Sequence, residues 1–120
     1  MITTLLVATI LCVLANAAVA VADYARAEFV LRNSARVRVP ARALPYLGTL
    51  KLAGAVGLVV GLAGWAWVGA AAGTGLLLFY IGAVAVHVRA RVLHTLAFPG
   101  TYLLLATAAV VHMARLTARS

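Results

Sequence analysis

Four apolar stretches run along the chain, separated by shorter polar or glycine-containing segments. Each stretch holds about 20 residues, which is the length a helix needs to cross the ~30 Å hydrocarbon core of a bilayer. A helix also satisfies its own backbone hydrogen bonds, as lipid requires. We therefore predict an all-α fold: an integral membrane bundle of four transmembrane helices, in one domain over residues 1–120. The predicted spans are about 2–22, 44–64, 67–88 and 95–114.

The first stretch, residues 2–22, also has features of a cleaved signal peptide. Ala15-Asn16-Ala17 and Ala18-Val19-Ala20 match the small-x-small pattern found at cleavage sites. However, no Lys or Arg precedes the apolar run, and the run is long for the apolar region of a signal peptide. We expect a retained helix.

The segment between the first two spans, residues 23–43, is polar and basic. Asp23 and Arg26 stand three residues apart, and Glu28 and Arg32 stand four apart, which are spacings that support a helix. The residue before Pro40 avoids helical geometry, so the chain should be extended there. We predict a short basic interfacial segment between helices 1 and 2.

Composition excludes a soluble domain. The chain is 66% hydrophobic, has a mean hydropathy of +1.10 and contains only 12 charged side chains, counted as 10 Lys and Arg plus 2 Asp and Glu. Its net charge of +8 does not indicate nucleic acid, because the arginines lie between apolar stretches and are not interleaved with aromatic residues. The expected partner of these arginines is the lipid bilayer, through its anionic headgroups.

The arginines also predict an orientation. The segments 23–43 and 89–94 carry seven of them, and the C-terminal end carries Arg115 and Arg119. Loops rich in Lys and Arg remain in the cytoplasm. We therefore expect both basic loops in the cytoplasm and both termini outside.

Glycines recur at helical spacing in the second and third spans. On a helix of 100° per residue, those of the second span fall within a sector of roughly 80°. Those of the third form a Gly-x-x-x-Gly pattern, which permits close helix contact. We predict helix packing at Gly54, Gly57, Gly61, Gly64, Gly69 and Gly73.

Several polar residues interrupt the apolar spans at similar predicted depths, counted at ~1.5 Å per residue. We expect a polar or ligand-binding layer of Asn16, Lys51, Tyr80 and Tyr102, with His87 two turns from Tyr80. Lys51 can either extend its amine to the headgroups or pair with an acid. The chain has two acids, Asp23 and Glu28, and Asp23 is better placed. The tyrosines and His87 are also common as plain core or interface residues.

The remaining reactive side chains suggest no catalytic or metal site. Cys12 is the single cysteine, so the chain has no internal disulfide or Cys-x-x-Cys pair. His87, His94 and His112 lack metal-ligand spacing on any one helix. We assign no catalytic residue and no metal, and favour a protein without enzymatic activity.

Three segments together resemble the DoxX-like family of small membrane proteins from high-GC bacteria: residues 47–58 (LGTLKLAGAVGL), 77–83 (LLFYIGA) and 87–91 (HVRAR). The resemblance covers nearly the whole chain and implies a four-helix membrane bundle in a bacterial inner membrane. It also implies a link to redox complexes, because the family takes its name from a subunit associated with thiosulfate:quinone oxidoreductase. A mycobacterial relative is described as a membrane partner of superoxide dismutase and a sulfurtransferase. Family members often have a glycine and a lysine near the end of the first helix, where this chain reads ANAAVAVAD over residues 15–23.

Three functions fit these observations. The first is a non-catalytic accessory or scaffold subunit of a membrane-associated redox complex, with a membrane or peripheral protein, or a second copy of the chain, as partner. The second is a quinone- or lipid-binding subunit of a membrane oxidoreductase, with quinone or lipid as its ligand. The third and least favoured is a small transporter, since no inverted repeat is visible.

Overall fold

A computed structural model describes residues 2–94 and 96–119, and this part of the chain is helical without strands. Four helices in it are long and apolar enough to cross a membrane, so the predicted all-α membrane fold is confirmed. The elements in chain order are α1 (Ile2–Tyr24), α2 (Glu28–Arg36), the short 3-10 helix η1 (Ala41–Ala43), α3 (Leu44–Leu62), α4 (Ala66–Arg89) and α5 (Ala97–Arg119).

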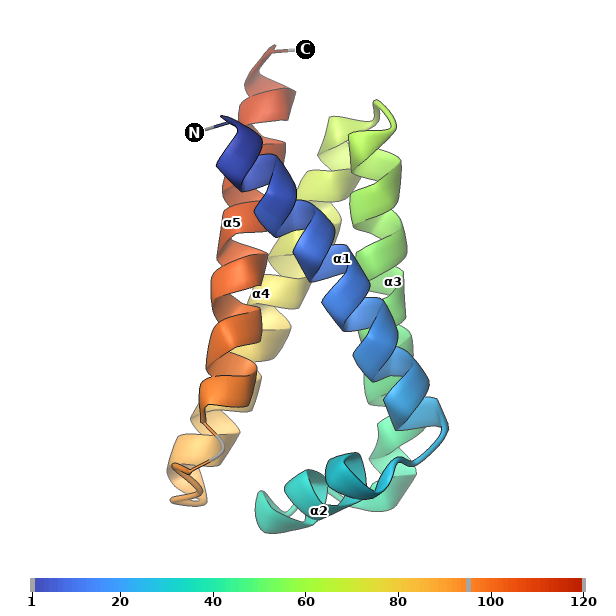
Figure 1. Ribbon diagram of the computed structural model, residues 1–120, viewed down its shortest axis with the longest axis vertical. Coiled ribbons are helices and arrows are strands. Elements are labelled where there is room, and N and C mark those ends of the chain that lie inside the picture. The colour runs from blue at the N-terminus through green and yellow to red at the C-terminus, as the bar shows by residue number, and fades with distance from the viewer. Residues whose placement is uncertain (1, 95, 120) are drawn as a thin grey trace.

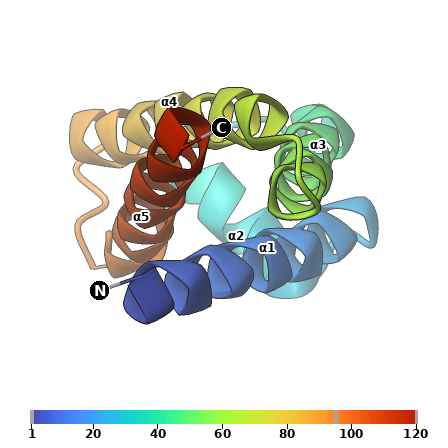
Figure 2. The same cartoon turned by 90° about the horizontal axis from the view of Figure 1, so that it is seen from above.

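The four long helices form a ring in the order α1, α3, α4, α5, so that α5 lies beside α1 (Figure 2). The two ends of this bundle differ (Figure 1). We call one the turn end, where both termini and the α3–α4 turn lie, and the other the α2 end, where α2 crosses below the ring. The longest extent of the molecule is 43 Å, which suits a bilayer with its headgroup layers.

Most ends of the long helices lie within two residues of the predicted spans, and two of the differences have a local physical reason. α3 ends at Leu62, because Gly64 adopts φ +130° and turns the chain toward α4. A Cβ added at Gly64 would meet nothing within 4 Å, so Gly64 is a turn residue and not the packing residue we expected. α5 continues to Arg119 instead of ending near 114, since no Gly or Pro follows Gly100 to stop it.

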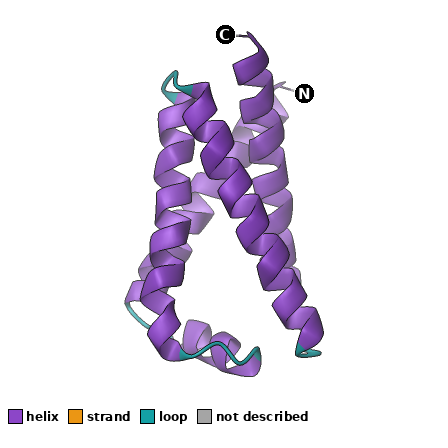
Figure 3. Cartoon of the chain, turned by 180° about the vertical axis from the view of Figure 1, so that it is seen from behind, coloured by secondary structure: helices purple, strands orange, loops and turns teal. Residues whose placement is uncertain are grey.

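The other glycines of α3 bring it against α4 in an antiparallel register. A Cβ added at Gly61 would lie 2.6 Å from the Cα of Gly69, so the two backbones touch there. One turn further along, Gly57 faces Ala72. Gly54 then faces Leu76, whose side chain would lie 2.5 Å from a Cβ added at Gly54. The side chain that α4 presents to α3 thus increases in size with distance from the turn, from Gly69 to Ala72 to Leu76. We call this series the wedge. It accompanies the separation of α3 from α4 toward the α2 end, which Figure 3 shows.

The core lies between the four helices. Met113 of α5 reaches the contact of Gly61 with Gly69, where Cβ atoms at these glycines would lie within 3 Å of its Sδ. Gly73 similarly receives Val110 of α5, at 3.1 Å from an added Cβ. The buried cluster comprises Cys12, Leu58, Leu76, Tyr80, Ala106, Ala109 and Met113. The small residues therefore act as contact points between helices, as their spacing predicts.

The α2 helix folds back below the ring after a sharp turn. Arg26 has φ 52° in this turn, and the Arg26 and Ala27 amides donate to the Asp23 and Ala22 carbonyls, which ends α1. Val30 and Ser34 are buried on the face of α2 that meets the bundle. This short amphipathic helix covers the end of the space between the long helices.

Candidate functional site

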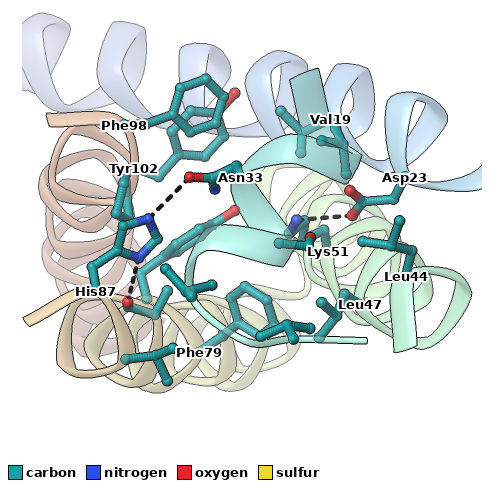
Figure 4. Close-up of a pocket in the computed structure, with 18 of the residues that line it drawn as sticks. Val19, Asp23, Asn33, Leu44, Leu47, Lys51, Phe79, His87, Phe98 and Tyr102 are labelled. Atoms are coloured by element: carbon teal, nitrogen blue, oxygen red, sulfur yellow. Dashed lines mark hydrogen bonds and ion pairs between the residues drawn. The ribbon is translucent and has the colours of Figure 1, made fainter. Parts of the chain in front are cut away.

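A cavity of about 560 Å³ lies at the α2 end of the bundle, within the 300–1,000 Å³ typical of small-molecule sites. All five α-helices contribute to its wall, and α2 covers it at the end (Figure 4). Most of the lining side chains are apolar. The polar exceptions in the lining are Asp23, Arg32, Asn33, Ser34, Arg36, Lys51, Tyr80, His87 and Tyr102.

Lys51 and Asp23 form a buried ion pair in this wall (Figure 4). The Lys51 Nζ donates to Asp23 Oδ2 at 2.8 Å, and the two residues are 9% and 1% exposed. Gly48 permits this pairing, because a Cβ there would lie only 3.1 Å from the Asp23 Cβ. The amine thus stays inside the bundle and does not extend to its surface. The other acid, Glu28, pairs instead with exposed Arg32 at 2.9 Å.

Asn16 and Tyr80 form a second polar contact. The Tyr80 hydroxyl donates to Asn16 Oδ1 at 2.5 Å, and the Asn16 amide donates to the Cys12 carbonyl at 2.8 Å. The Tyr102 hydroxyl donates to the Ala15 carbonyl at 3.3 Å. The expected polar layer is therefore divided. Tyr80 and Tyr102 line the cavity together with Lys51, whereas Asn16 is fully buried behind them and does not line it.

His87 connects α4 to α2. Its Nδ1 lies 2.8 Å from the Ala83 carbonyl, which can only accept, so Nδ1 carries a proton. Its Nε2 lies 3.3 Å from the side-chain oxygen of Asn33 on α2. The sequence placed Asn33 within a polar block, and nothing distinguished it from the neighbouring polar residues. His87 therefore lies where the wall of the cavity meets its α2 cover.

A row of aromatic rings runs along the cavity. Phe98 stacks on Tyr102 at 5.3 Å with an interplanar angle of 12°, and Tyr102 lies 5.4 Å from Tyr80. Phe29 of α2 extends the row at 6.2 Å from Phe98, and Phe79 extends it at 5.1 Å from Tyr80. The three phenylalanines were not predicted as site residues from the sequence. The i,i+4 spacing of Phe98 and Tyr102 was the one available signal that two of these rings share a helix face.

The Lys51 amine adds a cation to this apolar wall. Its Nζ lies 5.4 Å from the centre of the Phe79 ring, a cation–π distance. An ammonium has three N–H donors, and Asp23 accepts one of them. The remaining donor capacity faces a cavity lined by aromatic and aliphatic groups. The site can therefore hold a flat, mostly apolar molecule whose polar atoms accept hydrogen bonds.

Metal binding has no comparable support. Among residues 2–94 and 96–119, no three His, Cys, Asp or Glu side chains gather as metal ligands. Cys12 is buried in the core, away from the cavity lining.

Comparison with known proteins identifies the family. The model of the DoxX-like family matches residues 7–114, which is most of the chain. No curated protein and no solved structure matches it. Together with the four membrane-length helices, this match makes the chain a multi-pass membrane protein. The protein belongs to the DoxX-like family.

Proposed function

We propose that this protein is a quinone-binding accessory subunit of a membrane-associated oxidoreductase. The observation that carries this proposal is the cavity in which the Lys51 amine and a row of aromatic rings face the same space. Cavities that hold small molecules combine an apolar wall with a few polar groups that orient the ligand. This cavity has both.

The chemistry of a quinone head suits these groups. The head is flat, and Tyr102 and Phe98 supply stacked ring surfaces at the cavity wall. Its carbonyl oxygens accept hydrogen bonds, which Lys51 can donate without leaving Asp23. A positive charge close to such an oxygen also stabilises the reduced, more negative head. A quinone carries electrons and protons, and the electron donor in this proposal is a partner protein.

The role as a subunit rests on the family. The resemblance to a family that includes a subunit associated with an oxidoreductase supports a protein partner. The proposed ligand site and the proposed partner are separate claims, because a quinone site can be measured on the purified chain alone.

We also propose the bacterial inner membrane, with the α2 end in the cytoplasm. Three residues with positive φ, Arg26, Arg38 and Arg91, stand at the ends of α1, α2 and α4. Glycine is the usual residue at such positions. Arginine at all three supports selection for positive charge at the α2 end, which the positive-inside rule places in the cytoplasm.

The test of quinone binding uses the purified protein in lipid nanodiscs. Isothermal calorimetry with a short-chain ubiquinone analogue should give saturable binding to one site. The double variant Asp23→Asn/Lys51→Met removes both charges together, and should weaken binding by about tenfold or more. Thr74→Ala on the exposed face of α4, outside the cavity, serves as the matched control and should bind as the wild type does. Absence of saturable binding to the wild type would refute the proposal.

A further inference from the structure

Gly82 occupies an unusual place in the cavity wall. It lines the cavity, yet it is exposed at the outer surface of α4, and a Cβ added there would meet nothing within 4 Å. It precedes Arg89, the last residue of α4, by seven residues, or roughly 10 Å along the helix. At that depth the outer surface of α4 faces hydrocarbon, because α4 is one of the membrane-length helices. The cavity therefore reaches the lipid-facing surface within the span.

The opening lies between α3 and α4. These helices are in backbone contact at Gly61 and Gly69, near the turn end. Toward the α2 end the cavity separates them, and Leu47 of α3 and Val86 of α4 line it while only partly buried. The divergence of the two helices is visible in Figure 3. The same wedge that holds them apart thus produces a lateral gap with apolar edges.

The polar end of the cavity is covered. Buried Val30 and Ser34 face it from α2, together with Asn33, which contacts His87. The ring of Phe29 rests 6.2 Å from Phe98 on α5. A ligand coming from the bilayer meets the gap beside Gly82 and reaches the cavity without passing α2.

We propose that the gap beside Gly82 is a lateral portal, through which the apolar tail of a bilayer-resident ligand leaves the cavity. The polar head then lies near Lys51, and the tail remains in the hydrocarbon between α3 and α4. This inference rests on the proposed function for the identity of the head, and adds that the physiological ligand is long-tailed and exchanges with the bilayer.

The size of the cavity supports a tail that leaves it. A volume of about 560 Å³ suits a drug-sized molecule, and a head with a long isoprenoid or acyl chain exceeds that size. An apolar chain that passes through the portal loses no contact with hydrocarbon and needs no further cavity. Binding at this site should therefore depend little on tail length once the portal is reached.

The experiment blocks the portal with Gly82→Phe and compares it with Gly75→Phe. Gly75 precedes Gly82 by seven residues on the same exposed face of α4, and it also has no atom within 4 Å of an added Cβ. It does not line the cavity. Both variants add the same side chain to open space, so helix content and thermal unfolding in nanodiscs should match. Gly82→Leu provides a smaller block if the phenylalanine perturbs folding.

The readout is binding of two quinones with one head, one carrying a long isoprenoid chain and the other none. Gly82→Phe should weaken binding of the long-chain quinone by about tenfold or more and change the tailless quinone by less than about twofold. Gly75→Phe should change neither. An equal effect of Gly82→Phe on both quinones, or no effect on either, would overturn the portal.

Native mass spectrometry of retained phospholipid separates this inference from the proposed function. If the wild type binds neither quinone, quinone binding fails, but the portal can still hold a lipid chain. The wild type and Gly75→Phe should then retain a phospholipid that Gly82→Phe loses. Equal retention by all three proteins would refute the portal as well.

Discussion

Asp23 and Lys51, 28 positions apart in the sequence, form an ion pair of 2.8 Å in the interior of the bundle. Asp23 is the last but one residue of α1, and Lys51 lies two turns into α3. The two helices can approach so closely because Gly48 has no side chain between them. The pair therefore connects the first and third elements of the wall of the cavity, and its integrity should matter for both folding and ligand binding.

Removing one partner of this pair should destabilise the protein strongly. Lys51→Met leaves a buried carboxylate without a counter-charge, and Asp23→Asn leaves a buried ammonium, at a cost of about 3–5 kcal/mol each. The double variant should lose less than the sum, since neither charge remains. Unfolding in detergent by denaturant, measured for all four proteins, gives the coupling energy. Additive losses would show that the pair contributes no coupling.

The hydrogen bond from Tyr80 to Asn16 should contribute measurably to stability, which removal of the Tyr80 hydroxyl oxygen tests. Tyr80→Phe keeps the ring against Tyr102 but leaves the buried Asn16 oxygen without its donor, at a cost of about 1–3 kcal/mol. Tyr46→Phe is the matched control, because the Tyr46 side chain is 74% exposed on α3. Thermal unfolding of both variants tests this expectation. A Tyr80→Phe protein as stable as the control would contradict it.

The sequence was sufficient to predict the membrane-crossing helices and the Lys51–Asp23 pair of the site. Apolar length alone predicted the membrane-crossing elements, and glycine spacing predicted helix packing at Gly61 and Gly69, though not that these two residues meet. Asp23 emerged as the candidate partner of Lys51 by elimination, because the chain has only one other acid. These inferences depend on local periodicity or on counting, and both can be read from one chain.

The cover of the cavity could not be predicted in this way. The return of α2 below the bundle depends on positive φ at Arg26, and an arginine gives no signal of such a turn. Asn33 lines the cavity because α2 crosses to α4, and the same crossing brings Phe29 against Phe98 of α5. The wedge between α3 and α4 similarly arises from pairs of residues on different helices, whose register no single helix reveals.

The different surroundings of Gly61 and Gly75 predict opposite effects of a larger side chain at these two positions. Gly61→Val would force a branched side chain into the backbone of Gly69, which separates α3 from α4 near the turn and should cost about 1–3 kcal/mol or more. Gly75→Ala adds a methyl group to open space on α4 and should stabilise the helix by up to about 1 kcal/mol. Thermal unfolding in detergent checks both signs. Equal effects at the two positions would mean that α3 and α4 do not touch as described.

The proposed orientation predicts which surface cysteines react from each side of the membrane. Arg38→Cys is exposed at the α2 end and should react with a membrane-impermeant maleimide only after spheroplasts are permeabilised. Trp65→Cys, 66% exposed in the wild type at the turn end, should react in intact spheroplasts. The wild-type protein is the control, because its Cys12 is fully buried. The reverse pattern would invert the proposed orientation.

The end of α4 offers a test of the backbone strain at the α2 end. Arg91 has φ 60°, and its amide donates to the Val88 carbonyl while that of Val92 donates to His87, the pattern of a helix end that usually contains glycine. A residue with a Cβ pays roughly 1–2 kcal/mol for this conformation. Arg91→Gly removes that cost, but glycine also loses more freedom on folding, by about 0.5–1 kcal/mol.

A comparison of Arg91→Gly with Arg91→Ala isolates this strain from the charge. Both variants remove the same guanidinium, but alanine keeps a Cβ at positive φ. The glycine variant should therefore be the more stable of the two, by about 0.5–1 kcal/mol in thermal unfolding. If Arg91→Ala were as stable as Arg91→Gly, or more stable, the positive φ at this position would carry no strain. If Arg91→Gly is also more stable than the wild type, the arginine lowers the stability of the protein. That result is expected if the Arg91 charge is kept for its interaction with the membrane surface.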